Sequence, residues 1–276
     1  MKILANAKIN LTLDVLYKRE DGYHQIDSIM QSVGLYDEVY IKKSDKISVI
    51  CDNSELNGEK NSGFIAAKKF FEFSQINSGA EINIKKNIPV CAGLGGPSAD
   101  AAAVICGLDK IYNTDLDYES LVKIAKSVGA DVPFCLTGGT ARVGGIGEVV
   151  KYMPVLTDYF AILIKDGEKS STKEMYSKID NNAKKQNFTS DFISDLKQGR
   201  IPQSCGNDFI FGEEHFLVFS RLKETGADIV SLSGSGPYVF GIFKTYDKAL
   251  NSQKILLEKY KDVYLVPFSE SGIVFD

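Results

Sequence analysis

Polar and apolar residues alternate strictly near the beginning of the chain. Over residues 8–13 every second residue is Ile or Leu, and the residues between them are polar. This period of two is typical of a β-strand with one buried face. The pattern therefore predicts a strand and places Lys8 and Asn10 on the same, polar side of it.

Short apolar runs and stretches with helical spacing follow one another along the rest of the chain. The runs predict strands at 39–42, 47–51, 80–85, 228–233, 238–243 and 262–267. The helical spacing predicts helices at 63–73, 98–112, 117–128, 215–225 and 246–260. Asp117 is a suitable N-cap for the third of these helices, and the last one carries its apolar residues on one stripe.

The composition changes near the middle of the chain. Residues 137–149 contain five glycines, which predict hairpin turns between short strands. Residues 167–206 are polar and are expected to be helical or loop-like, and a clean strand–helix alternation follows. Together these patterns predict an α+β protein of two domains, residues 1–154 and 155–276, with the boundary near Pro154.

A glycine-rich segment precedes the helix expected at 98–112. Residues 93–102 read GLGGPSADAA, with three glycines in four positions. Pro97 and Ser98 suit the start of a helix, with Ser98 as its cap, and the open N–H groups of a helix N-terminus favour a phosphate. A tight connection without a ligand is the alternative, but the density of glycines favours a phosphate loop.

The common phosphate-binding motifs are nevertheless absent. The chain has no GK dipeptide, so it has no P-loop, and Ser98 stands where the dinucleotide fingerprint needs Gly. The HRD and DFG motifs of protein kinases are missing as well. A nucleotide site in this chain must belong to another class.

Composition and charge exclude several functions. The 276 residues are 44% hydrophobic with a net charge of −4 and no Lys/Arg block, so no nucleic-acid partner is expected. Five cysteines without a CxxC pair indicate reduced thiols and a cytoplasmic location, and the two histidines form no metal motif. We expect neither a signal peptide nor a membrane span, because no run of about 18 apolar residues occurs.

Four segments together resemble the GHMP kinase superfamily. They are AKINLTLDV at 7–15 with DGYH at 21–24, the segment 89–105, the segment 129–148 and LSGSGPYVFGIF at 232–243. DGYH and GADVPF are typical of one branch of the superfamily, which phosphorylates CDP-methylerythritol in non-mevalonate isoprenoid biosynthesis. The resemblance implies a ribosomal-protein-S5-like first domain, a ferredoxin-like second domain and a cleft between them.

The resemblance also implies a reaction and its catalytic residues. Asp131 matches the base that takes a proton from the 2-hydroxyl of the acceptor, and Lys8 matches the lysine that pairs with it. The phosphoryl donor is ATP, accompanied by Mg²⁺. Taken alone, Asp131 fits an ordinary turn or capping residue, and Lys8 fits a solvated lysine at a strand edge.

The binding residues follow from the same comparison. The implied ATP site consists of Lys86, Pro89, Val90, Cys91, Ala92, Gly93, Leu94, Gly95, Gly96, Pro97, Ser98, Ala99, Gly234 and Ser235. The implied acceptor site consists of Asn10, Tyr23, His24, Thr172 and Tyr176. In it Tyr23 and Tyr176 cover the two faces of a cytosine ring and His24 contacts its edge. A helix cap and an exposed aromatic are the alternatives for Thr172 and Tyr176.

This chain departs from the family pattern at three positions. Pro97 stands where Gly is commonest, Ala99 replaces a Ser, and Tyr238 stands where Thr is frequent. Two other functions stay open: a different GHMP kinase, acting on mevalonate or homoserine, and a non-catalytic nucleotide-binding regulator. We expect a monomer or a homodimer that acts on a small molecule.

Overall fold

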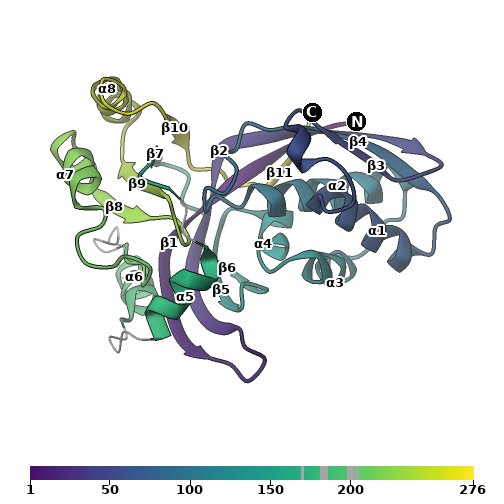
Figure 1. Cartoon of the computed structure of the whole chain (residues 1–276), viewed down its shortest axis with the longest axis horizontal. Helices are drawn as coiled ribbons and strands as arrows, with labels where there is room; N and C mark the ends of the chain where they lie inside the picture. Colours follow the sequence, from purple (N-terminus) through teal and green to yellow (C-terminus); the bar gives the residue numbers. More distant parts are fainter. Residues whose placement is uncertain (169–170, 181–185, 198–201, 203–204) are drawn as a thin grey trace.

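A long antiparallel ribbon runs through the centre of the molecule (Figure 1). The computed structural model describes residues 1–168, 171–180, 186–197, 202 and 205–276, without the side chains of Thr172 and Lys173. The ribbon consists of β1 (Lys2–Lys18) and β2 (His24–Ser44), paired from Lys2–Tyr40 to Lys18–His24. Both strands extend far beyond the predicted segments 8–13 and 39–42.

The whole ribbon belongs to the first sheet. Its order is β11-β1-β2-β4-β3, and β5 and β6 attach to β2 as a hairpin. The further strands are β3 (Ser48–Cys51), β4 (Gly79–Lys85), β5 (Thr140–Gly145), β6 (Val149–Tyr152) and β11 (Ile273–Phe275). Strands were predicted at three of these places, including the glycine hairpin, whereas β11 was not.

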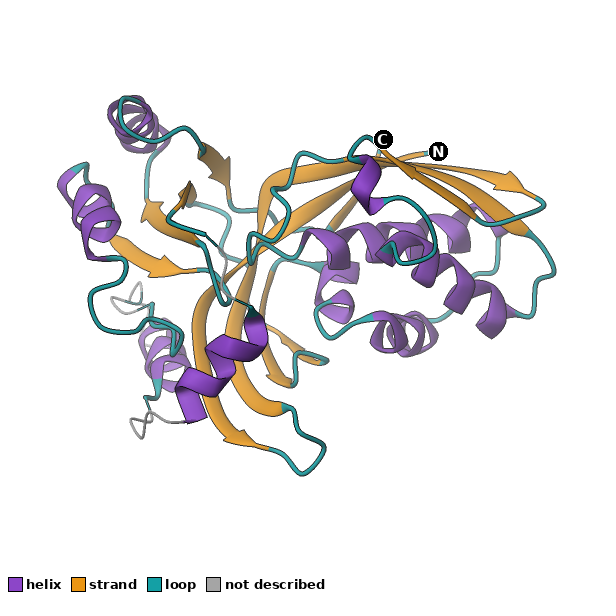
Figure 2. Cartoon of the chain, in the orientation of Figure 1, coloured by secondary structure: helices purple, strands orange, loops and turns teal. Residues whose placement is uncertain are grey.

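Helices cover one face of this sheet (Figure 2). They are α1 (Ser62–Ser74), α2 (Gly96–Tyr112), α3 (Tyr118–Val128) and the short α4 (Val132–Thr137), with a 3₁₀ turn η1 (Ser54–Leu56) before them. The side chain of Asp117 accepts the N–H of Ser120 and caps α3, as predicted. The alanines at 101–103 are fully buried, which lets α2 lie close to the sheet.

Two sequence predictions about this region were wrong. The helix expected at 98–112 begins at Gly96, and its N-cap is Gly95, whose φ of 75° closes the turn without a side-chain hydrogen bond. Ser98 therefore lies within the first turn and does not cap it. The polar side of β1 is not solvated either, since Lys8, Asn10 and Thr12 are all buried.

The second sheet is smaller and lies on the other side of the ribbon. It has the antiparallel order β10-β7-β9-β8, formed by β7 (Phe160–Lys165), β8 (Ile229–Leu232), β9 (Tyr238–Phe243) and β10 (Val263–Pro267). Helices α7 (Phe216–Glu224) and α8 (Tyr246–Leu257) pack on it, and α5 (Thr172–Asp180) and α6 (Phe188–Lys197) lie beside the ribbon (Figure 1). This is the expected ferredoxin-like arrangement, although β7 was not predicted.

The core consists of two buried clusters, and each contains residues of both sheets. One cluster includes Ile9 and Phe134 together with Phe240 of β9, and the other includes Phe243 together with Leu13 of β1. After β10 the chain returns to the first sheet, where β11 pairs with β1. The division into 1–154 and 155–276 stays a prediction. It separates β11 from β1 in sequence, although these two strands pair in the same sheet.

Candidate active site

Lys8 lies at the centre of a buried polar network on β1. Its Nζ donates to Asn10 Oδ1 at 2.7 Å and lies 3.5 Å from Asp131 Oδ2. Asn10 in turn donates to Ser28 Oγ at 2.9 Å. The alternation in the sequence thus placed Lys8 and Asn10 correctly side by side. The surrounding burial overturns the alternative of a solvated lysine, because only 6% of the Lys8 side chain is exposed.

Asp131 is held at the beginning of α4. It is the N-cap residue of this helix, with Pro133 in the first turn, yet its side chain makes no capping hydrogen bond. The carboxylate therefore faces Lys8 instead of the helix backbone, and its exposure of 29% leaves it accessible from the cleft. A sequence reading of Asp131 as a turn residue did not foresee this helix.

The glycine loop passes directly over Lys8. The Lys8 N–H donates to the carbonyl of Leu94 at 2.9 Å, and a Cβ added to Gly95 would lie 2.8 Å from Lys8 Cγ. Gly93 also has a positive φ, and a Cβ there would lie 2.4 Å from the carbonyl oxygen of Ser233. Glycine is needed at both positions because there is no room for a side chain.

A cavity of about 510 Å³ connects these parts. Its walls combine Lys8, Asn10 and Asp131 with the predicted loop residues 89–97 and with Gly234 and Ser235. The long helix α2 begins at this loop, and no side chain caps its first N–H groups. Its dipole and these open N–H groups therefore favour an anion here. The structure thus unites segments from four distant parts of the sequence.

A second cavity, of about 210 Å³, adjoins the first on the side of the loop. Both share Pro89, Val90 and Gly96, and the second also borders Lys86 and the η1–α1 connection. Lys86 is buried here, and two carboxylates surround its ammonium group. Lys86 therefore lies beside the loop as expected, but the sequence did not predict that it is buried or which carboxylates it contacts.

A third cavity, of about 330 Å³, adjoins the central one on the opposite side and shares Ile146 and Tyr176 with it. It is lined by Tyr23, a residue that is 61% exposed, and by His24, which is buried. His24 stacks on Tyr176 with ring centroids 4.5 Å apart. The predicted trio therefore meets in one place.

The hydrogen-bond partner of His24 was not predicted from the sequence. His24 Nε2 lies 2.7 Å from Asp180 Oδ1, and this hydrogen bond lowers the pKa of the Asp180 carboxyl. Burial raises the pKa of Tyr176 to about 12, so its hydroxyl stays neutral. No motif marks Asp180, because its contact with His24 spans 156 positions. Thr172 begins α5, but its side chain lies outside the described residues.

Two further polar residues fix the loop that contains Gly234. Asn207 Nδ2 donates to the carbonyls of Leu232 and Gly234, both at 2.8 Å. Ser233 Oγ donates to the carbonyl of Gly93 at 3.0 Å. These contacts join the second sheet to the glycine loop, and only the tertiary structure reveals them. Ser98 and Ala99 lie in the first turn of α2 behind the loop.

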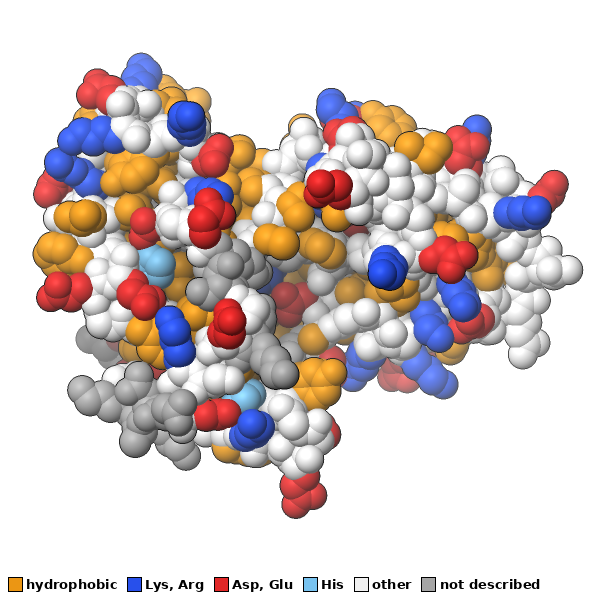
Figure 3. All heavy atoms as spheres, viewed as in Figure 1, with side chains coloured by type: hydrophobic (Ala, Val, Ile, Leu, Met, Phe, Trp, Pro, Cys, Tyr) orange, Lys and Arg blue, Asp and Glu red, His pale blue; other side chains and the backbone are white. Residues whose placement is uncertain are grey.

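Charged side chains of both signs lie on the surface. On the face drawn in Figure 3, basic and acidic side chains are interspersed. In the described part of the chain, no helix is long and apolar enough to cross a membrane. The same residues contain no group of three or more His, Cys, Asp or Glu that could hold a metal ion.

The fold and the glycine loop over a lysine–aspartate pair define a GHMP kinase. The family model "GHMP kinases N terminal domain" matches residues 61–139. Among solved structures, a homoserine kinase from Cytophaga hutchinsonii has the same fold, with a TM-score of 0.71 at 20% identity over 99% of this chain and 96% of its own.

Closer relatives narrow the assignment. A 4-diphosphocytidyl-2-C-methyl-D-erythritol kinase of Clostridium tetani is 39% identical over 96% of this chain and 99% of its own. The corresponding kinase of Clostridium botulinum Eklund 17B is 40% identical with the same coverage. A crystal structure of 4-(cytidine 5'-diphospho)-2C-methyl-D-erythritol kinase matches with a TM-score of 0.80 at 28% identity over 98% of this chain and 99% of its own. The chain belongs to the 4-diphosphocytidyl-2-C-methyl-D-erythritol kinase family.

Proposed function

We propose that this protein transfers the γ-phosphoryl group of ATP to the 2-hydroxyl of 4-diphosphocytidyl-2-C-methyl-D-erythritol, in non-mevalonate isoprenoid precursor biosynthesis. The observation that carries the proposal is the Lys8–Asp131 pair, 3.5 Å apart, in the cavity between the glycine loop and the aromatic cavity. Membership in the family supports the same reaction.

The three adjoining cavities suggest how the two substrates bind. The nucleoside of ATP occupies the cavity beside Lys86, and its phosphates lie along residues 89–99 with Gly234 and Ser235 closing over them. The acceptor enters from the cavity of Tyr23, His24 and Tyr176. Its cytosine is then held away from the ATP, and its erythritol end reaches Asn10 and Asp131 in the centre.

In this arrangement each central group has a separate task. Asp131 accepts the proton of the 2-hydroxyl as its oxygen forms a bond to the γ-phosphorus and the bond between that phosphorus and the ADP oxygen breaks. Lys8 places a positive charge beside the reacting oxygen, and Asn10 holds the Lys8 ammonium in place. The N–H groups of the glycine loop stabilise the phosphate charge without any side chain.

Mg²⁺ fits this donor set as a companion of the nucleotide. It prefers oxygen ligands and keeps several waters, so it needs few ligands from the protein once phosphate oxygens are present. Asp131 and Ser235 line the central cavity and Ser98 lies in the first turn of α2, so their oxygens would be the protein ligands available to the ion. When bound, the ion neutralises phosphate charge.

The setting of the protein in the cell is part of the same proposal. All five cysteines are free, and burial raises the pKa of four of them: Cys106 and Cys205 to about 12, and Cys51 and Cys135 as well. Such inert thiols suit a reducing compartment, for which we propose the cytoplasm. We propose a monomer or a homodimer as the working unit.

Turnover with different acceptors tests the proposal. ATP consumption is measured with 4-diphosphocytidyl-2-C-methyl-D-erythritol, mevalonate, homoserine or no acceptor. We expect turnover with the first alone. Turnover with mevalonate or homoserine would assign the chain to another GHMP activity, and ATP binding without any turnover would support the regulator.

Replacing the proposed base identifies its role. Asp131→Asn keeps the shape of the side chain but cannot accept the proton, so kcat should fall by about 10²–10⁴ while ATP binding, measured by calorimetry, persists. Asp158→Asn, which alters an exposed carboxylate outside the three cavities, should behave like the parent. A kcat within a few-fold of the parent for Asp131→Asn would remove Asp131 from the mechanism.

A further inference from the structure

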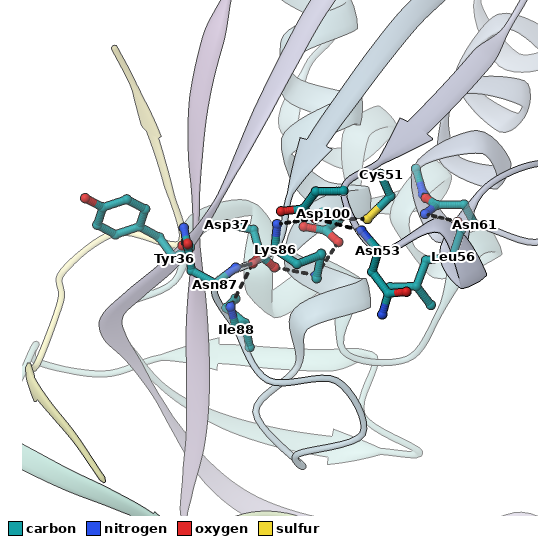
Figure 4. Close-up of polar contacts among 12 residues, drawn as sticks. Tyr36, Asp37, Cys51, Asn53, Leu56, Asn61, Lys86, Asn87, Ile88 and Asp100 are labelled. Atoms are coloured by element: carbon teal, nitrogen blue, oxygen red, sulfur yellow. Dashed lines mark hydrogen bonds and ion pairs between the residues drawn. The ribbon is translucent and has the colours of Figure 1, made fainter. Parts of the chain in front are cut away.

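Three charged side chains are buried beside the glycine loop, and two of them line the cavity proposed for the nucleoside of ATP. Lys86 follows β4, Asp37 belongs to β2, and Asp100 belongs to α2. Their side chains are only 8%, 0% and 4% exposed. Figure 4 shows Lys86 between the two carboxylates, and we refer to these three residues as the clamp.

The contacts of the clamp join three elements to one ammonium group. Lys86 Nζ donates to Asp37 Oδ2 and, at 2.6 Å, to Asp100 Oδ2. Asp37 Oδ1 also accepts the N–H groups of Asn87 at 2.6 Å and of Ile88 at 2.8 Å. The backbone that enters the glycine loop is thus fixed to β2, and the helix that leaves it is fixed to the same ammonium.

The clamp also touches the loop itself. A Cβ added to Gly96 would lie 3.3 Å from Lys86 Nζ, so the ammonium lies directly against the first residue of α2. Beyond Ile88, the loop exposes Val90 and Cys91 and is next fixed at Gly93, whose carbonyl accepts from Ser233 Oγ, and at Leu94, whose carbonyl accepts the Lys8 N–H. The position of residues 89–93 therefore depends on the clamp at one end and on Ser233 and Lys8 at the other.

Stability alone does not account for these charges. A buried set of one ammonium and two carboxylates is costly, and apolar residues of similar size are often equally stable or more stable in its place. Asp100 Oδ1 is moreover buried without a hydrogen-bond partner among the described residues. A buried group that is not fully satisfied calls for another reason to be there, and short charge-assisted hydrogen bonds fix geometry better than apolar contacts do.

We propose that the clamp is a positioning device for ATP: Lys86, Asp37 and Asp100 hold the ends of the glycine loop so that its N–H groups meet the phosphates. The inference rests on the proposed function, since it specifies how that nucleotide site keeps its shape. In this role the Lys86 ammonium supports the loop from the wall of the second cavity, which Asp100 also lines, and it acts on the phosphates by holding the backbone of residues 87–96.

Variants of Asp100 test the clamp without leaving a lone buried charge. Asp100→Ala removes the arm to α2 while Lys86 stays paired with Asp37, and Asp100→Asn keeps an oxygen that accepts from Lys86. Asp100→Ala should weaken ATP binding, measured by calorimetry, and raise the KM for ATP by ~10- to 100-fold, because small displacements of positioning groups are costly. The KM for the acceptor should stay within about twofold, and Asp100→Asn should restore ATP binding to near the parent value.

Two neighbouring lysines provide the matched comparison. Lys86→Met should weaken ATP binding at least as much as Asp100→Ala does. Lys85→Met, one position earlier, alters an exposed lysine that pairs with Glu38 on the surface, and should leave ATP binding unchanged. Melting temperatures identify variants that lose stability, and affinities are compared on the folded protein only.

The possible outcomes separate the clamp from the proposed function. Equal ATP affinity for folded Asp100→Ala and the parent would overturn the clamp, as would equal losses in the KM values for ATP and acceptor. A parent that binds ATP but does not phosphorylate the acceptor would overturn the proposed function. The clamp would then be tested by the ATP affinities of the variants alone. A parent that binds no nucleotide would overturn both.

Discussion

Lys8 shows how a single residue acquires its role from its surroundings. It is a common surface residue type placed on a strand, yet the loop above it and Asn10 beside it remove it from water. A buried ammonium is tolerated only with partners, and Asn10 and Asp131 are those partners. The pair combines a fixed charge with a carboxylate that the cleft can reach.

Removing the Lys8 charge should affect the reaction more than nucleotide binding. Lys8→Met keeps the length of the side chain, and we expect kcat to fall by about 10²–10³, the usual effect of losing one charge-stabilising donor. The KM for ATP should change little, and Lys42→Met, an exposed lysine on β2, serves as the control. If ATP affinity collapsed while the chemical step was unchanged, Lys8 would be a nucleotide ligand instead.

Asp100 should make stability depend on pH. Burial raises its pKa to about 7, against the opposing effect of Lys86, whereas an unfolded Asp titrates near about 3.9. Between these values the folded state binds the extra proton, so the contribution of Asp100 to stability falls as the pH rises from about 4 to about 7. Asp100→Asn cannot ionise, and its free energy of unfolding should therefore increase relative to the parent over this range.

Urea unfolding of both proteins at several pH values measures this difference. Asp158→Asn, an exposed carboxylate, corrects for the effect of removing a charge in general. A difference between Asp100→Asn and the parent that is constant from about pH 4 to 7 would contradict the raised pKa.

At the scale of elements, the glycine loop and α2 form one unit. The positive φ values at Gly93 and Gly95 turn the chain into the helix, and Pro97 occupies a first-turn position where no N–H is needed. Pro97 thus replaces the commoner glycine of the family without disturbing the turn, since its φ suits a helix start.

A methyl group at Gly95 should disturb both the loop and Lys8. Gly95→Ala forces an L-residue to a φ of 75° and brings its Cβ to 2.8 Å from Lys8 Cγ, so we expect about tenfold or greater loss of ATP affinity together with a lower kcat. Gly226→Ala shares the positive φ but has nothing within 4 Å of the added Cβ. It should lose stability without losing ATP affinity, and equal affinities for both variants would contradict the close packing of the loop.

At the scale of the whole molecule, the ribbon of β1 and β2 connects the two halves of the site. It belongs to the first sheet and also packs against the second. Its far end places Tyr23 and His24 beside α5, where His24 meets Tyr176 and Asp180. Its middle carries Lys8 beneath the glycine loop. The proposed acceptor and ATP sites are thereby separated along one ribbon.

This separation predicts that the two substrates respond independently. Tyr23→Ala should raise the KM for the acceptor by roughly 10- to 100-fold, the usual value of one stacked base, and leave the KM for ATP unchanged. Tyr17→Ala removes another exposed tyrosine of the same ribbon that does not line the cavity, and should have no effect. CDP should compete with the acceptor, and a failure to compete at any practical concentration would exclude a cytosine site.

Much of this protein is determined by local sequence. The exact bounds of β9 follow from the apolar run at 238–243 and the cap of α3 from Asp117, because both depend on neighbouring residues alone. The order of the glycine loop, Lys8 and Asp131 identifies the kinase family for the same reason: each motif is short and chemically distinctive.

Tertiary structure decided what depends on distant partners. The length of β2 was missed because much of that strand is polar, and its burial comes from the elements packed around it. Asp180, Asn207 and the clamp were missed because each contact joins residues that lie far apart in the chain or whose pairing no motif records. The sequence by itself thus specified which chemical groups the site contains, whereas folding decided which of them are buried. Burial matters because charges interact more strongly away from water and are held in place by the groups packed around them.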